Sequence, residues 1–400
     1  MSFFSESINR IKPSATMAVT QKARELKEQG KDIIGLGAGE PDFDTPENIK
    51  SAAIDAIKRG ETKYTAVDGT PELKNTIKLK FERENNLEYS TNEISVGTGG
   101  KQIIFNAFAV TINKNDEVII PAPYWVTYPD VVNYFNGIPT FIECPESNNF
   151  KLTPEQLERS IKQSTKWVIL NSPSNPTGSC YTKDELIGIG KVLAKHSHVN
   201  ILSDDLYEHI IYDDKEFFTI AQVVPELKDR TLTLNGVSKA YAMTGWRIGY
   251  AGGHADLIKA MSKLQSQSTS NPTSISQAAA VEALSGNNDF IKERSTVFKK
   301  RRDNLVSALN NMNGISCLCP DGAFYVFPSC KELIGKKDPS NKIINNDQDF
   351  VTSLLEHAGV AVVQGSAFGM EGYFRISYAT SDEALDRACS KIDDFTKKII

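Results

Sequence analysis

The hydrophobic residues in the middle of the chain fall into short, unbroken runs that are separated by longer amphipathic segments. Short apolar runs bounded by polar or turn residues predict buried strands. Because helical patterns lie between the runs, we expect an α/β fold with a mostly parallel sheet covered by helices on both faces. The predicted strands are Val118–Pro121, Trp167–Asn171, Ile201–Asp204, Thr231–Asn235 and Ile248–Ala251.

Two of the intervening segments carry signals for the start of a helix. Thr182 precedes the helical pattern Lys183–His196, and Glu185 follows three residues later, so that both side chains can bond free backbone N–H groups. Thr153 is followed by Pro154, and proline is favourable at the first helical position because its φ is already fixed. We therefore expect helices to begin at both places.

The two ends of the chain are less regular. A single hydrophobic core stops growing at about 250–300 residues, so 400 residues predict two domains. We expect a large domain over residues 48–290 and a smaller α+β domain over residues 291–400, which residues 1–47 join as an N-terminal arm. The end segments are predicted as a helix at Ala15–Gln29, long helices within Ser274–Asn313, strands at Ala323–Phe327 and Phe374–Tyr378, and helices at Asn346–Gly359 and Asp382–Lys397.

Composition narrows the choice of partners. The chain has 45 basic and 50 acidic residues and a net charge of −5, without the dense basic block expected of a nucleic-acid or membrane-surface protein. No apolar run approaches the roughly 20 residues that span a bilayer, and no signal peptide is recognisable. Six cysteines occur without a C-x-x-C pair, so we expect reduced thiols, no metal site and a cytoplasmic protein.

The strongest chemical signal is the segment Ser238–Tyr250, which follows the predicted strand Thr231–Asn235. Its lysine, Lys239, is either a surface lysine or a nucleophile whose amine is activated by burial or by a neighbouring cation. Schiff-base formation with an aldehyde cofactor is a reaction that needs such an amine. Asp204 ends the strand Ile201–Asp204 and is either a helix cap or the carboxylate that keeps a pyridine nitrogen protonated.

Other polar groups follow neighbouring strands. Tyr207 and Asn175 are placed to donate to a cofactor oxygen, although Asn175 also fits a rigid turn in which one or both of the Pro173 and Pro176 peptide bonds are cis. Trp125 follows the strand Val118–Pro121 and either stacks on a cofactor ring or belongs to the core.

Anionic groups have candidate partners as well. Gly99 and Gly100 precede the helical pattern Gln102–Ile112, whose first N–H groups are available to a phosphate, and Arg247 adds a bidentate partner. Arg375 interrupts an apolar strand, where a charge is costly unless it is paired. Its partner is either a substrate carboxylate or a structural salt bridge.

Taken in order, these segments resemble class I aminotransferases of the pyridoxal-phosphate fold type I over nearly the whole chain. Within that family the sequence is most similar to a subgroup of bacterial aspartate aminotransferases whose N-terminus reads KPSAT, here Lys12–Thr16. The segments that carry the resemblance are GAGEPDFDTP (Gly37–Pro46), KYTAVDGTPEL (Lys63–Leu73), NSPSNPTG (Asn171–Gly178), SDDLYE (Ser203–Glu208), SKAYAMTGWRIGY (Ser238–Tyr250) and FRISYAT (Phe374–Thr380).

The resemblance implies a large domain with a mostly parallel seven-stranded sheet between helices, a smaller α+β domain and pyridoxal 5′-phosphate as cofactor. It implies that Lys239 binds the cofactor covalently and then moves the substrate proton, and that Asp204 pairs with the pyridine nitrogen. The other implied cofactor contacts are Tyr207 and Asn175 on the ring oxygen, Trp125 on the ring face, and Gly99, Gly100, Lys101, Ser238 and Arg247 at the phosphate. Tyr64 is implied to reach the phosphate of a second subunit, which makes the protein a homodimer.

For the substrate, the resemblance implies that Arg375 binds the α-carboxylate with the backbone at Gly39, next to Trp125 and Asn175. Lys101 and Thr16 are implied to hold the distal carboxylate, and Lys12 is found in relatives that also accept prephenate. Two residues depart from the family pattern, because Gln364 replaces a frequent proline and Asp205 replaces a common glutamate. Lys101 also remains open as a phosphate-binding or surface lysine.

The expected reaction transfers the amino group of L-aspartate to 2-oxoglutarate and gives oxaloacetate and L-glutamate in a ping-pong sequence. The expected small-molecule partners are therefore amino acids and 2-oxo acids. A prephenate-specific, bifunctional or aromatic aminotransferase, and other chemistry on the same cofactor, remain alternatives, because a fold does not decide the reaction. A cofactor-binding sensor without catalysis is disfavoured, because every catalytic position is filled.

Overall fold

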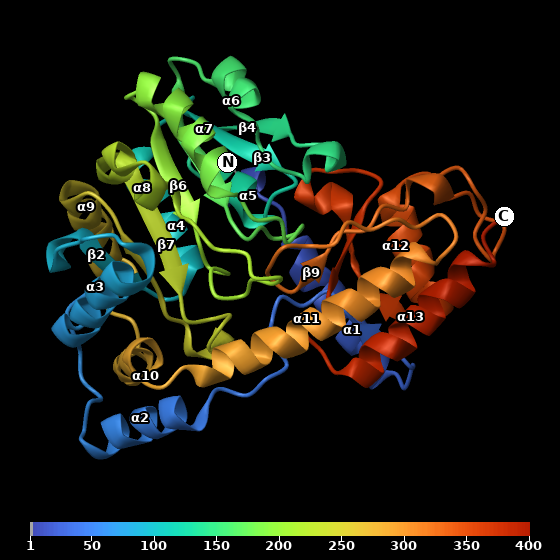
Figure 1. The fold of residues 1–400 in the computed structure, drawn as a ribbon, viewed down its shortest axis with the longest axis horizontal. Helices are drawn as coiled ribbons and strands as arrows, with labels where there is room; N and C mark the ends of the chain where they lie inside the picture. Colours follow the sequence, from blue (N-terminus) through green and yellow to red (C-terminus); the bar gives the residue numbers. More distant parts are fainter. Residues whose placement is uncertain (1–2) are drawn as a thin grey trace.

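A seven-stranded sheet organises the computed structural model, which describes residues 3–400. The strand order is β2-β8-β7-β6-β5-β3-β4, and β8 alone runs antiparallel to its neighbours (Figure 1). The mostly parallel sheet that the sequence predicts is therefore confirmed. The strands are β2 (Ile94–Gly97), β3 (Glu117–Ala122), β4 (Ile138–Glu143), β5 (Thr165–Asn171), β6 (Asn200–Asp204), β7 (Thr231–Gly236) and β8 (Gly249–Gly252).

Alternate residues of the strands face opposite helical layers, as the two-residue period of a strand requires. Ile119, Val168 and Ile201 pack against one layer, whereas Val118, Ile169 and Leu202 pack against the other. The first layer contains α6 (Pro154–Ser160), α7 (Lys183–Lys195) and α8 (Ile220–Val223), and the second contains α4 (Gly100–Thr111), α5 (Thr127–Tyr134) and α9 (Ala255–Ser266). We call the sheet and these layers the large region.

Helices α2 (Glu47–Lys58), α3 (Pro71–Asn85) and α10 (Ser274–Ser285) pack together beside β2 and β8. From α10 the chain continues into α11 (Asp289–Asn310), which runs from the large region to the far end of the molecule (Figure 1). The break between α10 and α11 divides the long helical stretch predicted over Ser274–Asn313.

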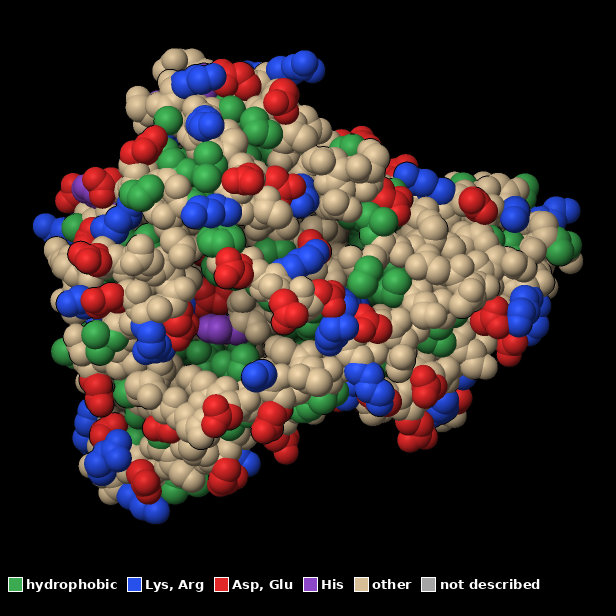
Figure 2. Space-filling model, in the orientation of Figure 1, with side chains coloured by type: hydrophobic (Ala, Val, Ile, Leu, Met, Phe, Trp, Pro, Cys, Tyr) green, Lys and Arg blue, Asp and Glu red, His purple; other side chains and the backbone are tan. Residues whose placement is uncertain are grey.

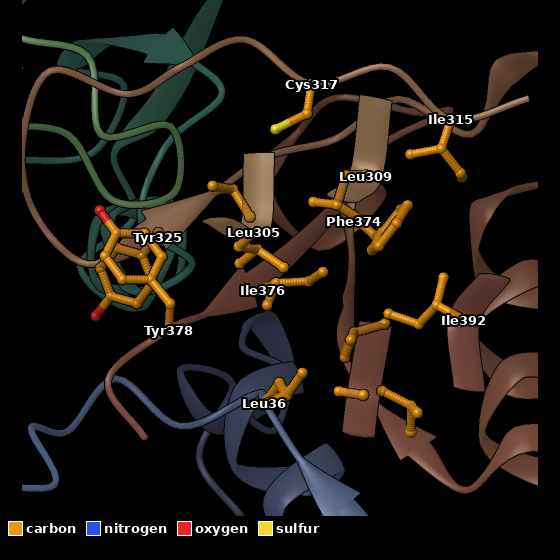
Figure 3. Close-up of a cluster of buried hydrophobic side chains, with 14 of the residues drawn as sticks. Leu36, Leu305, Leu309, Ile315, Cys317, Tyr325, Phe374, Ile376, Tyr378 and Ile392 are labelled. Carbon is orange, nitrogen blue, oxygen red and sulfur yellow. The ribbon is translucent and has the colours of Figure 1, made fainter. Parts of the chain in front are cut away.

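The far end, which we call the small region, combines the C-terminal third with an N-terminal segment. Figure 3 shows Leu36 packed with Leu305 and Leu309 of α11 and with Phe374 and Ile376. The boundaries predicted near residues 47 and 290 remain a prediction. The small region contains α1 (Ala15–Glu28), α12 (Asp347–Ala358), α13 (Asp382–Thr396), β1 (Ile34–Gly35), β9 (Tyr325–Val326), β10 (Val360–Ala361), β11 (Val363–Gln364) and β12 (Phe374–Ser377).

Local signals placed most element boundaries correctly. Thr182 and Glu185 form the expected reciprocal cap at the start of α7, and Pro154 is the first residue of α6. The strand predicted over Ala323–Phe327 is shorter, because Ala323 has φ of 56° and cannot continue an extended strand. The prediction misses strands β2 and β4. Strand β4 has a largely exposed pattern, which does not resemble a buried apolar run.

The surface carries both signs of charge. On the face drawn in Figure 2, Lys and Arg side chains are interspersed with Asp and Glu, and no large area of one sign is visible. Within residues 3–400, no helix is both long and apolar enough to cross a membrane.

A buried ion pair ties α3 to the loops at the ends of the sheet. The Lys80 ammonium donates to Glu208, and the amides of Asn85 and Asn235 donate to the same carboxylate at 2.8 and 2.7 Å. Burial alone raises the pKa of Glu208, but the charge of Lys80 and the other donors bring that pKa below its ordinary value. All four side chains are buried, so the charges depend on each other rather than on water.

We predict that Glu208→Gln lowers the free energy of unfolding by about 3 kcal/mol, because the buried Lys80 ammonium loses its nearest counter-charge and keeps only the partly exposed Glu84 carboxylate at 3.5 Å. The double variant Lys80→Met/Glu208→Gln should be more stable than Glu208→Gln alone. Urea unfolding of the three proteins measures both effects. Equal stability of the wild type and Glu208→Gln would contradict the assignment.

Candidate active site

The carboxyl ends of three adjacent parallel strands deliver the predicted residues to one cavity. Asn175 follows β5, Asp204 ends β6 and Lys239 follows β7, and the register pairs Asn171 with Asp204. Ligands of open α/β sheets bind at this edge. The cavity has a volume of about 210 Å³ and is lined by Ser14, Thr16, Met17, Gly39, Lys101, Trp125, Val126, Thr127, Tyr128, Asn171, Asn175, Asp204, Leu206, Tyr207, Lys239, Tyr325 and Arg375.

The amine of Lys239 points into this cavity and donates to the backbone carbonyl of Gly39 at 2.6 Å. Burial, followed by the positive charge of Arg375, lowers the pKa of the Lys239 amine to about 8. A lysine amine is a nucleophile only after it loses its proton. Lys239 is therefore prepared for attack on a carbonyl at a pH where a free lysine is almost wholly protonated.

Asp204 is a buried carboxylate with few donors. Tyr128 donates its hydroxyl to Asp204 Oδ2 at 2.6 Å, and the Leu206 N–H lies 3.4 Å from Oδ1. Burial raises the pKa of Asp204 to about 6 in spite of these bonds. A cation placed beside Asp204 would lower that pKa again, which favours a protonated ring nitrogen as its partner. No pattern in the sequence indicates Tyr128, which lies 76 residues before Asp204.

Arg375 lies fully buried with neutral acceptors only. Its Nη1 donates to Asn175 Oδ1 at 2.8 Å, its Nη2 donates to the Gly37 carbonyl at 2.5 Å, and its Nε has no partner. No carboxylate of residues 3–400 forms an ion pair with this guanidinium, so the salt-bridge alternative does not hold for the described chain. An unpaired buried charge beside a cavity is arranged for an anionic ligand.

A second anion site is formed at the start of α4. The Arg247 guanidinium donates to the carbonyls of Thr244 and Thr98 at 2.9 and 3.4 Å, and a Cβ at Gly99 would collide with it. Gly249 permits an equally close approach, because a Cβ there would meet the backbone of Gly99 and Gly100. Free N–H groups and a guanidinium thus converge at a helix N-terminus, as a phosphate requires.

Lys101 and Thr16 also line the cavity. The Lys101 ammonium is 5.0 Å from the centre of the Trp125 ring, and the Thr16 hydroxyl is buried without a partner. Desolvation and the charge of Arg247 lower the pKa of Lys101. With Arg247, Lys239 and Arg375, this lysine gives the site a marked excess of positive charge.

Not every predicted residue reaches the cavity. Lys12 is exposed, and its backbone N–H donates to Asp130 at 3.3 Å. Tyr64 is 92% exposed, and Ser238 is buried, but neither lines the cavity. Conversely, Tyr325 was not predicted, yet its hydroxyl lies 2.7 Å from that of Tyr207.

The donor set fits pyridoxal phosphate. An activated amine, a buried carboxylate and an indole ring share one cavity, and the phosphate cradle of α4 lies beside it. Asn175 accepts from Arg375 through its Oδ1, which leaves the Asn175 amide N–H groups available for a ring oxygen. The Tyr207 hydroxyl is bonded to that of Tyr325.

A separate group of metal-ligand type occurs at Glu84, Glu208 and His209, whose ligand atoms lie within 4.8 Å of one another. Lys80 Nζ lies 3.5 Å from Glu84 and also contacts Glu208. The ammonium therefore already supplies the positive charge in this group.

Comparison with known proteins identifies the family of the chain. Residues 31–392 match the sequence model of the family described as aminotransferase class I and II. A probable aspartate/prephenate aminotransferase of Rhizobium leguminosarum is 60% identical, with 99% of each chain covered, and the aspartate/prephenate aminotransferase of Cereibacter sphaeroides is 58% identical over the same shares. The crystal structure of the aspartate aminotransferase from Rhizobium meliloti is 54% identical, with a TM-score of 0.97 over 100% of both chains. The Thermus thermophilus aspartate aminotransferase with maleate is 40% identical, with a TM-score of 0.93 over 99% of this chain and 100% of that one.

We predict that capture of pyridoxal phosphate by the cofactor-free protein accelerates as pH rises through about 8, because Lys239 loses its proton there. Arg375→Met should move this midpoint upward, since it removes a neighbouring positive charge. Stopped-flow absorbance across pH measures the rate, with Lys239→Ala as the control without covalent capture. A midpoint near 10.5, the ordinary lysine value, would show that Lys239 is not activated.

Proposed function

Because the chain belongs to the class I and II aminotransferases, we propose that it uses pyridoxal phosphate to transfer the amino group of L-aspartate to 2-oxoglutarate, giving oxaloacetate and L-glutamate. The observation that carries this proposal is the meeting of the Lys239 amine and the Asp204 carboxylate in one cavity. The relatives named aspartate/prephenate and aspartate aminotransferases support the choice of donor.

When bound, the cofactor supplies an aldehyde that accepts the amino group and a protonated ring that withdraws electrons from the substrate α-carbon. Asp204 keeps the ring nitrogen protonated, and Tyr128 orients that carboxylate. Lys239 holds the cofactor in the resting enzyme and afterwards serves as the base at the α-carbon. Trp125 covers the ring face, while Arg247 and the N-terminus of α4 bind the phosphate.

The arrangement of cations explains a preference for dicarboxylates. Arg375 binds the α-carboxylate through its free Nε–H and its remaining Nη–H groups, because Asn175 and Gly37 occupy only part of its donors. Lys101 and the unpartnered hydroxyl of Thr16 line the same cavity and suit a distal carboxylate. Two cationic anchors in one cavity of about 210 Å³ favour small dicarboxylic acids.

Prephenate is a second candidate acceptor. Relatives that are 60% and 58% identical over nearly their full length carry aspartate/prephenate in their names. Prephenate also has two carboxylates, so the same cationic anchors apply to it. The exposed Lys12 lies outside the cavity and would need to move to contact such a substrate.

We further propose a homodimer in which Tyr64 serves the phosphate site of the other subunit. The Tyr64 side chain is almost fully exposed and does not line the cavity of its own chain. One exposed aromatic side chain is ordinary on a protein surface, so the proposal rests on the family resemblance, which implies that Tyr64 serves a second subunit.

We predict that the holoenzyme transaminates aspartate with 2-oxoglutarate and that Lys239→Ala abolishes the reaction. A panel with phenylalanine as an alternative donor and prephenate as an alternative acceptor separates the related activities. Product analysis measures each pair. Turnover of aromatic donors alone would exclude the proposed aspartate activity.

We predict that Lys101→Met raises the KM for aspartate by roughly 10- to 100-fold, because one charge-assisted bond is worth about 1.5–3 kcal/mol. The KM for alanine, which has no distal carboxylate, should change little, and alanine therefore serves as the internal control. Equal losses for both substrates would assign Lys101 to the phosphate instead.

We predict that mixing inactive Lys239→Ala and impaired Tyr64→Ala chains restores part of the activity. In a mixed dimer, one of the two sites combines an intact Lys239 with an intact Tyr64 from the neighbouring chain. Activity assays after subunit exchange, with each variant alone as control, measure the recovery. Mixtures no more active than their components would contradict shared sites.

A further inference from the structure

The segment Gly37–Thr45 contacts the main cationic groups of the site. The carbonyl of Gly37 accepts from Arg375 at 2.5 Å, and the carbonyl of Gly39 accepts from Lys239 at 2.6 Å. At the other end of the segment, the Thr45 hydroxyl donates to the Ala242 carbonyl at 2.7 Å. The segment therefore forms part of the cavity wall, and its backbone carbonyls bind both Arg375 and Lys239.

There is little free space around Gly39 in this segment. A Cβ on Gly39 would lie 2.5 Å from the hydroxyl of Tyr325, and Tyr325 is bonded in turn to Tyr207. The ring of Tyr325 also lies 4.5 Å from the Arg375 guanidinium. A shift of the backbone by a fraction of an ångström would therefore disturb several groups of the cavity at once.

On its other side the segment is fastened to α11. Arg301 forms a bidentate pair with Asp42, with Nη1 and Nη2 at 2.8 and 2.9 Å from the two carboxylate oxygens. Its Nε donates at 2.9 Å to Asp382, the first residue of α13. Arg294, almost two turns earlier on α11, donates to the Asp44 carbonyl at 2.7 Å and lies 4.9 Å from the Phe43 ring.

The chemistry of this contact suits positioning. A guanidinium and a carboxylate joined by two parallel bonds fix direction as well as distance, which a lysine cannot do. The Arg301 side chain is only 8% exposed, so the contact is less screened than an ordinary surface pair. One arginine thus links the active-site segment to α11 and to the start of α13.

We propose that Arg301 and Asp42 are a positioning pair for substrate binding. The pair holds Gly37–Thr45 against α11 and α13, so that the backbone of Gly39 keeps its position relative to Lys239 and Arg375. Neither residue lines the cavity, and each acts through the segment. The inference deepens the proposed function, on which it rests for the choice of ligand.

The test uses the holoenzyme and the variants Asp42→Asn and Arg301→Lys. Succinate, a dicarboxylate without an amino group, is titrated while the absorbance of bound pyridoxal phosphate is followed. The matched control is Lys300→Met, because Lys300 donates at 2.9 Å to the same Asp382 carboxylate and forms no ion pair with Asp42. Hydrogen exchange of the amides of residues 37–45 is measured in parallel without cofactor.

Both variants should raise the succinate Kd and the aspartate KM at least about tenfold, while kcat at saturation changes less than about threefold. The ligand-free spectrum should stay close to that of the wild type, because residues 37–45 touch Lys239 through one backbone carbonyl and supply none of the other proposed cofactor contacts. The amides of residues 37–45 should exchange faster in both variants, and the double variant should resemble the single ones. Lys300→Met should leave all five readouts unchanged.

Succinate binding within about twofold of the wild type in Asp42→Asn, with unchanged exchange, would overturn the inference. An equal loss in Lys300→Met would also overturn it, since Asp382 and not the segment would then be responsible. If Arg301→Lys does not fold, Asp42→Asn and Arg294→Gln provide the same test. A wild-type protein that takes up no pyridoxal phosphate would refute the proposed function instead, whereas the exchange measurement would still decide whether the pair holds the segment.

Discussion

The register of three parallel strands is the constraint on which the site depends. Asn171 lies opposite Asp204, and Asp204 lies opposite Leu234, so β5 and β6 end level with each other and β7 ends two residues further on. Hydrogen bonding between the strands therefore brings together residues that are far apart in the chain. A slip of one residue in β6 would turn Asp204 to the opposite face of the sheet and remove it from the cavity.

The cavity carries an excess of positive charge. Lysine and arginine side chains gather where few carboxylates accompany them, and Asp204 is the buried acid among them. Such a site is unfavourable for the protein alone, because like charges are held close together with little water. Binding of a phosphate and of substrate carboxylates relieves this repulsion, so the same charges that strain the empty cavity favour the loaded one.

The sequence predicted the parts of the site that follow directly from strand ends. Lys239, Asp204 and Asn175 could be placed because each follows or ends a recognisable apolar run, and the sheet then brings them together. Their chemical roles still rest on the family resemblance and on the geometry. Tyr128 and Tyr325 could not be predicted, since their partners lie 76 and 118 residues away and no local pattern encodes such a contact. The pair of Arg301 and Asp42 spans 259 residues and is invisible in the sequence for the same reason.

The close contact of Gly249 with the start of α4 has a consequence for how this protein can diversify. Main-chain atoms of Gly99 and Gly100 fill the space that a side chain at residue 249 would need. This part of the anion cradle is therefore made of backbone, and Gly249 can hardly be replaced. Other groups of the site, such as Lys101 and Thr16, are side chains that line the cavity and that single mutations can exchange. New substrate preferences can therefore arise by changes of these side chains, while the backbone cradle for the phosphate is inherited without alteration.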